Sequence, residues 1–157
     1  MFRLRSAAIV TAAIPALVVA AGCGSSAQQV SATELAQKAD AICRDEQSKF
    51  DQIQAHPPAN ASIAADQTKE LIDVTNAASS DLRDLEPPDQ LSGPYGAYLQ
   101  ARDDAVDQMK RGQDAADNQD SAGYSAAQTA VAQSSPRRQR LAAAVGLKEC
   151  GSNPRSG

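Results

Sequence analysis

The stretch SATELAQKADAICRDEQSKFDQI, residues 31–53, decides the fold class of this chain. Ser31 precedes Glu34 at the spacing of a capping box, which is typical of the start of a helix. A stripe of positions then recurs at steps of three and four residues, the period of an α-helix with one face turned toward a core. The members of this stripe are Leu35, Ala39, Ile42, Cys43, Glu46, Phe50 and Ile53.

Prolines mark the ends of this helix and of the next one. His56-Pro57-Pro58 ends the first run, because the residue before a proline is pushed out of the helical conformation. Asn60 is a candidate N-cap for a second run, which Pro87-Pro88 closes. The stripe of the second run consists of Ile63, Gln67, Leu71, Val74, Ala78, Leu82 and Leu85.

Two further helical runs follow. The third begins near Ser92 and Pro94, since helices tolerate a proline close to their first turn. Its stripe consists of Tyr95, Tyr98, Leu99, Arg102, Val106 and Met109. The polar stretch 112–123 is expected to hold the third turn. The stripe of the fourth run consists of Tyr124, Ala127, Val131, Ser134, Leu141 and Val145.

Pro136 lies inside the fourth run. Ser135-Pro136 marks either the start of a separate short helix or a kink in one long helix, and the unbroken phase of the stripe favours the kinked helix. Gly146 suits a C-cap, and residues 151–157 are expected to form a disordered tail. Residues 31–150 are therefore predicted to form an all-α domain, an up-down antiparallel four-helix bundle.

The composition limits both the core and the choice of function. The chain has 157 residues, of which 42% are hydrophobic but only 3% aromatic, so we expect one domain with a thin, alanine-rich core. The net charge of −4 argues against a nucleic-acid-binding protein. Without residues 1–22, which hold two arginines and no acids, the net charge becomes −6.

The N-terminal segment has the parts of a secretory signal. Arg3 and Arg5 form a positive region, and an apolar stretch of about 15 residues follows, shorter than the roughly 20 that a spanning helix needs. The next residues, Ala20-Ala21-Gly22-Cys23, resemble the lipobox of bacterial lipoproteins. The resemblance implies a signal peptide at 1–22, acyl chains such as palmitate on Cys23, and a flexible tether at 23–30. The alternative is an ordinary cleaved signal with a free or disulfide-bonded Cys23.

The two remaining cysteines form an even pair in a chain sent to an oxidising compartment. A disulfide between Cys43 and Cys150 would tie the first helix to the end of the domain and close a loop of about 107 residues. Two buried free thiols are the alternative. The chain has no CxxC sequence, so neither a thioredoxin-type redox site nor covalent haem attachment is indicated.

Three short motifs of the mature chain resemble those of small secreted lipoproteins from actinobacteria. They are a cysteine in the first helix (AICRDE, 41–46), a Pro-Pro pair after leucine (LEPP, 85–88) and a terminal GLKEC at 146–150. That group has no established biochemical activity, so the resemblance implies a location and a layout but no mechanism.

The chain offers few groups for catalysis or metal binding. His56 is its single histidine and stands before two prolines, which excludes a Glu-x-x-His di-iron site. No G-x-S-x-G sequence is present, and we expect no metal site and no cofactor. The densest positive group is Arg137, Arg138 and Arg140, a possible anion contact for a phosphate-bearing envelope polymer or simply a solvated helix face. The three tyrosines are expected in the core, with hydroxyls at the bundle edge.

These observations predict an extracytoplasmic lipoprotein held at the cell membrane through Cys23. The expected role is non-enzymatic: a binding or interaction module whose partner is an envelope protein or polymer, and not a nucleic acid. The alternative is a carrier of a small ligand such as haem or a metal, or a hydrolase whose catalytic residues form no recognisable motif.

Overall fold

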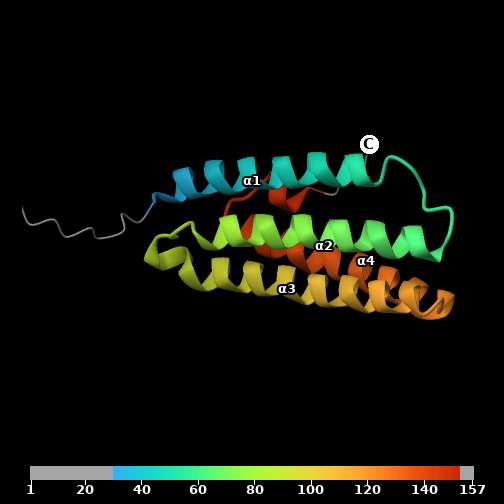
Figure 1. The fold of residues 1–157 in the computed structure, drawn as a ribbon. Helices are drawn as coiled ribbons and strands as arrows, with labels where there is room; N and C mark the ends of the chain where they lie inside the picture. Colours follow the sequence, from blue (N-terminus) through green and yellow to red (C-terminus); the bar gives the residue numbers. More distant parts are fainter. Residues whose placement is uncertain (1–29, 153–157) are drawn as a thin grey trace, which may run out of the picture.

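The computed structural model describes residues 30–152, and they form four helices that run up and down beside one another (Figure 1). The helices are α1 (Ala32–Ile53), α2 (Ala61–Arg83), α3 (Asp89–Asp117) and α4 (Ser121–Ala144), and a short 3₁₀ helix, η1 (Glu149–Gly151), follows. Each helix packs against the next one in the chain. The predicted all-α, up-down four-helix bundle is confirmed. The predicted signal peptide 1–22 and Cys23 lie outside the described residues.

Polar side chains define the helix ends that the sequence predicts. The Ser31 hydroxyl accepts a hydrogen bond from the Glu34 N–H at 3.2 Å, and the Asn60 side chain accepts one from the Ile63 N–H at 3.0 Å. Gln67, expected in the core stripe, instead donates from Nε2 to the His56 carbonyl at 3.0 Å. The second helix therefore satisfies a carbonyl that follows the end of α1.

The third helix is longer than predicted at both ends. It begins at Asp89 rather than near Ser92, and it continues to Asp117 through most of the stretch expected to be a turn. The reason is Gly112, which is buried: a Cβ on this residue would lie 3.2 Å from the Cβ of Ala127 on α4. Close packing of small residues thus keeps a polar stretch helical, and its polarity misled the prediction.

The α3–α4 turn is confined to three residues, Asn118–Asp120. Gln119 has φ 58°, and the Asp120 N–H donates to the Ala115 carbonyl at 2.8 Å, which is the long bond of a Schellman motif. The Asp120 side chain then accepts from the Gly123 N–H at 2.9 Å and caps α4. One aspartate therefore ends one helix and begins the next.

The fourth helix runs through Pro136 as a single element, so the one-helix interpretation is right and the split is wrong. Its end is also as predicted: Gly146 has φ 81°, and the Leu147 N–H donates to the Ala142 carbonyl at 3.0 Å. This second Schellman motif turns the chain back, so that η1 contacts both α1 and α4 (Figure 1). Gly151, placed in the tail by the sequence, is the last residue of η1.

The buried face of α2 is wider than the predicted stripe and is centred elsewhere. Ile63, expected in the core, is 40% exposed, whereas its neighbours Ala64 and Ala65 are buried. The reason is that α2 lies between α1 and α3 and must bury two sides, which it does with small side chains. The buried positions of α2 are Ala64, Ala65, Thr68, Ile72, Thr75, Ala78, Ser79 and Leu82.

The core is uneven along the bundle. At the end that carries the α2–α3 turn, large side chains including Leu35, Leu82 and Tyr95 form one buried cluster. Toward the α3–α4 turn a separate cluster consists of Ala64, Ala65 and Ala116, with Tyr124 packed against it. Among residues 30–152, no helix is both long and apolar enough to cross a membrane.

Gly146 allows a direct test of the turn that returns the chain to α1. Gly146→Ala should lower the free energy of unfolding by about 1 kcal/mol, because an alanine at φ 81° is strained. Gly96→Ala is the matched control: a methyl group added to this exposed glycine of α3 would meet no atom within 4 Å, so the change should raise stability by about 0.5–1 kcal/mol. Urea unfolding followed by circular dichroism measures both, and equal effects would contradict the turn geometry.

Candidate functional site

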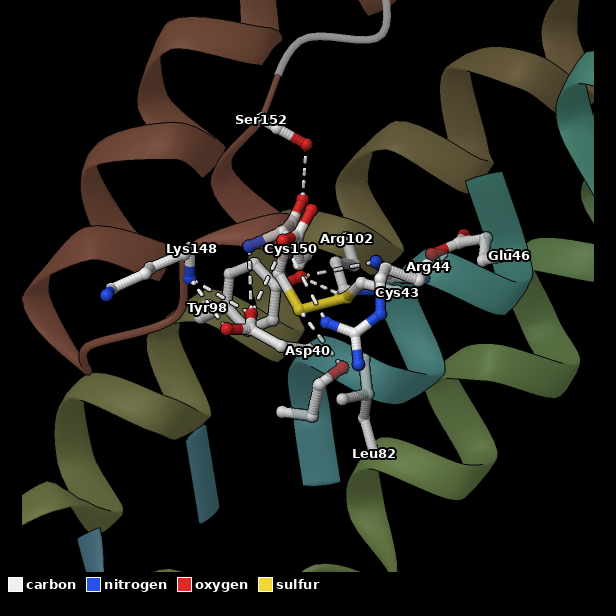
Figure 2. The surroundings of a disulfide bond; sticks show 12 residues. Asp40, Cys43, Arg44, Glu46, Leu82, Tyr98, Arg102, Lys148, Cys150 and Ser152 are labelled. Carbon is white, nitrogen blue, oxygen red and sulfur yellow. Dashed lines mark hydrogen bonds and ion pairs between the residues drawn. A yellow bond between two sulfur atoms is a disulfide. The ribbon is translucent and has the colours of Figure 1, made fainter. Parts of the chain in front are cut away.

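The C-terminal segment is attached covalently to α1. Cys43 of α1 and Cys150 of η1 form a disulfide, with their sulfur atoms 2.05 Å and their Cα atoms 5.1 Å apart (Figure 2). The pairing that the cysteine count favours is therefore present, and the free-thiol alternative is wrong. A bridge across 107 residues stabilises a chain by roughly 4–5 kcal/mol on loop-closure grounds.

A carboxylate reinforces this attachment without a covalent bond. Asp40, one turn before Cys43, accepts hydrogen bonds from the backbone N–H groups of Lys148 and Glu149, each at 2.9 Å (Figure 2). These donors precede and begin η1, so Asp40 caps that short helix from a different element. The sequence predicts the disulfide but offers no local signal for this cap, since the partners are more than 100 residues apart.

Beside the disulfide lies a group of polar side chains inside the bundle. We refer to Glu46, Ser79, Tyr98, Arg102, Ser134 and Arg138 as the polar layer, to which all four helices contribute. Arg102 is 7% exposed and is its centre. Its Nη2 donates to Glu46 Oε1 at 2.7 Å, its Nε to Ser79 Oγ at 3.1 Å, and its Nη1 to the Tyr98 hydroxyl at 3.3 Å.

The contacts of Arg102 explain how a charge is held inside a small bundle. Burial alone would lower the pKa of Arg102, but the Glu46 carboxylate and the Tyr98 hydroxyl outweigh burial and raise it. The guanidinium therefore stays charged. The face of the Tyr98 ring also attracts this charge, with its centroid 5.9 Å from Cζ. Among the described residues, no fully buried side-chain nitrogen or oxygen lacks a hydrogen-bond partner.

Tyr95 and Tyr98 are core residues, as predicted, but their hydroxyls do not reach the bundle edge. Tyr95 and Tyr98 are 2% and 1% exposed. The Tyr95 hydroxyl donates to the Leu82 carbonyl at 2.7 Å, and the Tyr98 hydroxyl lies 3.8 Å from Cys43 Sγ. The prediction was wrong on this point because both hydroxyls find partners inside the bundle. Burial raises the pKa of both phenols.

The structure separates the three arginines predicted as an anion contact. Arg137 pairs with Asp104 of α3 at 3.2 Å. Arg138 is half-buried and donates to Ser134 Oγ, and Arg140 is exposed. The single histidine, His56, is exposed in the α1–α2 loop. The three guanidiniums therefore do not converge on one point, and the fold gives each a different surrounding.

The shallow surface grooves on the described part of the chain include two of similar volume. One, about 610 Å³, runs along α1 beside Cys43 and Glu149, and the other, about 560 Å³, lies near the α3–α4 turn beside Asp114 and Asp120. Both are lined by mixed polar side chains, and neither reaches the polar layer. Within residues 30–152, histidine, cysteine and carboxylate side chains form no group of three that could hold a metal ion.

The polar layer could have been suspected from the sequence. Glu46 and Arg102 both occupy core-facing stripes, with opposite charge on two helices. Arg138 also has the phase of the fourth stripe, between Ser134 and Leu141. Charged residues at such positions are almost never buried unless paired, which was the available signal. The periodicity could not show which helices face one another, so the partners were missed.

Comparison with known proteins yields no relative: no family model, curated protein or solved structure matches this chain.

The buried ion pair can be tested by removing one charge. Glu46→Gln should lower the free energy of unfolding by about 3 kcal/mol, because it leaves the buried Arg102 without its counter-charge. Asp104→Asn, which breaks the exposed pair with Arg137, is the matched control and should cost less than about 1 kcal/mol. Denaturant unfolding measures both. Losses of similar size would contradict the central role of Arg102.

The raised pKa values of Tyr95 and Tyr98 predict instability in alkali. Both phenols stay protonated in the fold while the unfolded chain ionises near pH 10, so stability should hold below pH 10 and fall above it. Each tyrosine contributes a slope of up to about 1.4 kcal/mol per pH unit. Between about pH 10 and 11.5, Tyr98→Phe should reduce the fall of the free energy of unfolding with pH by up to about 1.4 kcal/mol per pH unit, the contribution of one proton. An unchanged slope would contradict the burial of this phenol.

Proposed function

We propose that this protein is a lipid-anchored extracytoplasmic module of the cell envelope, with a binding role rather than a catalytic one. The observation that carries the proposal is Cys23, at the end of an apolar leader and seven residues before the first described residue. Acyl chains on one cysteine bind a bilayer through about 0.8 kcal/mol per buried methylene, so two or more chains hold it firmly.

The contact of Val30 with the bundle supports a membrane-facing end for the proposed anchor. The Val30 N–H donates to the Glu86 carbonyl at 3.2 Å, so the chain enters the bundle beside the α2–α3 turn. Seven residues span at most about 25 Å, which keeps this end near the membrane. The 23 residues of α2 extend about 35 Å, so the α1–α2 loop and the α3–α4 turn face away from it.

The charge at the membrane-facing end supports an upright arrangement. Asp81, Asp84 and Glu86 surround the α2–α3 turn and are exposed. Carboxylates are repelled by anionic lipid headgroups, so this end should stand off the surface on its tether rather than lie on it. The long faces of the bundle and the far end are then free to contact other envelope components.

The fixed contacts around Arg102 support a binding role over catalysis. Arg102 occupies one Glu46 oxygen and holds Ser79 and Tyr98 in fixed contacts. A carboxylate paired with a buried guanidinium is a weak base, and a general base must reach its substrate within about 3 Å. Arg102 and these three partners therefore serve the fold, and the surface is left to recognise a partner.

The lipid anchor is tested by Cys23→Ser in the cell of origin. The wild-type protein should partition into the detergent phase and carry the mass of acyl chains, whereas the variant should lose both because a hydroxyl cannot form the thioether. Cys43→Ser is the matched control: it breaks the disulfide but should remain acylated in the membrane fraction. A processed Cys23→Ser protein that stays membrane-bound would overturn the proposal.

A further inference from the structure

Arg138 differs from its two arginine neighbours because it lies on the inner face of α4. Its position continues the spacing of Ala127, Val131 and Ser134, the residues that face the bundle. It is half-buried, and its one hydrogen bond is donated to the Ser134 hydroxyl on its own helix. Ser134 in turn donates to the Val131 carbonyl at 2.7 Å. The guanidinium therefore has a neutral partner and unused N–H donors.

The charges around Arg138 do not balance. The polar layer holds two guanidiniums, those of Arg102 and Arg138, but one carboxylate, that of Glu46. The Glu46 carboxylate already pairs with Arg102, and Asp104 of α3 pairs with Arg137. Among the ion pairs of the described residues, none includes Arg138. Partly buried charges are normally paired, so this one lacks a counter-ion.

The pKa of the Arg138 guanidinium is consistent with the absence of a counter-ion. Burial lowers the pKa of the Arg138 guanidinium, and repulsion by the nearby charge of Arg102 lowers it further. Tyr98 and Glu46 raise this pKa but do not compensate for burial and for Arg102. An additional negative charge at this position would therefore stabilise the folded protein.

We propose that Arg138 is the anchor of an anion site that takes a phosphate group, which would reach the part of this half-buried side chain that solvent also reaches. The planar guanidinium presents paired N–H donors that match a phosphate oxyanion, and attraction between two charges is stronger beside a half-buried group than in bulk water. Arg140, exposed two residues later, lacks that environment. The proposal names the ligand class of the binding module described above and rests on it for the setting in which the ligand is met.

The test uses the full-length chain, purified in a non-ionic detergent, and measures thermal unfolding against phosphate concentration at constant ionic strength. Inorganic phosphate should raise the Tm of the wild type more than chloride does. Arg138→Gln should abolish this shift or weaken the apparent phosphate affinity at least about tenfold. Arg140→Gln, the matched control on the same helix, should keep it. Equal loss in both variants, or an equal shift with chloride, would overturn the proposal.

A second measurement separates a ligand-binding arginine from a structural one. In buffer without phosphate, Arg138→Gln should be at least as stable as the wild type, because it removes a charge that Arg102 repels. A lower Tm for this variant would show that Arg138 serves the fold, and would overturn the proposal.

Poly(glycerol phosphate) distinguishes the two sources of a phosphate group. If a polymer supplies the phosphate group, calorimetric titration with this polymer should show binding to the wild type and to Arg140→Gln but not to Arg138→Gln. If free phosphate supplies it, inorganic phosphate should shift the Tm and the polymer should not bind. Failure of both titrations overturns the anion site. The lipid anchor, measured by acylation at Cys23, would be unaffected by that result.

Discussion

The buried ion pair between Arg102 and Glu46 is the interaction on which the arrangement of this bundle depends. Its two partners come from α3 and α1, which are not consecutive in the chain, so it joins the first helix to the far side of the bundle. Alanines make up half of the buried hydrophobic residues, and each buries little apolar area. The disulfide from Cys43 and the Asp40 cap then attach the C-terminal segment to the same stretch of α1.

The ion pair also leaves the second guanidinium of the polar layer without a carboxylate partner. Because Glu46 is committed to Arg102, the second guanidinium of the polar layer, Arg138, has a hydroxyl where a carboxylate would be expected. Residues that bind ligands are often those whose local environment lowers stability. The proposed phosphate site follows from this imbalance and not from the number of arginines on α4.

Much of the secondary structure could be predicted because its causes are local. Ser31 and Asn60 cap the helices that they precede, and Gly146 adopts the positive φ that ends α4. The even cysteine pair predicts the disulfide once an oxidising compartment is inferred. The errors arose where neighbours decide: the polar end of α3 is helical because Gly112 lets α4 approach, and Ile63 is exposed because α2 buries a different face.

Spacing, composition and residue counts along the chain predict four amphipathic helices, their caps and a thin core, and they favour a disulfide between Cys43 and Cys150 over two free thiols. The candidate site could be predicted only in part from the sequence. Glu46, Arg102 and Arg138 all stand at core-facing positions, but periodicity reports which way a residue faces and not what it meets. The tertiary structure brings α1, α3 and α4 to one level, so that two guanidiniums lie near a single carboxylate and only one of them, that of Arg102, pairs with it.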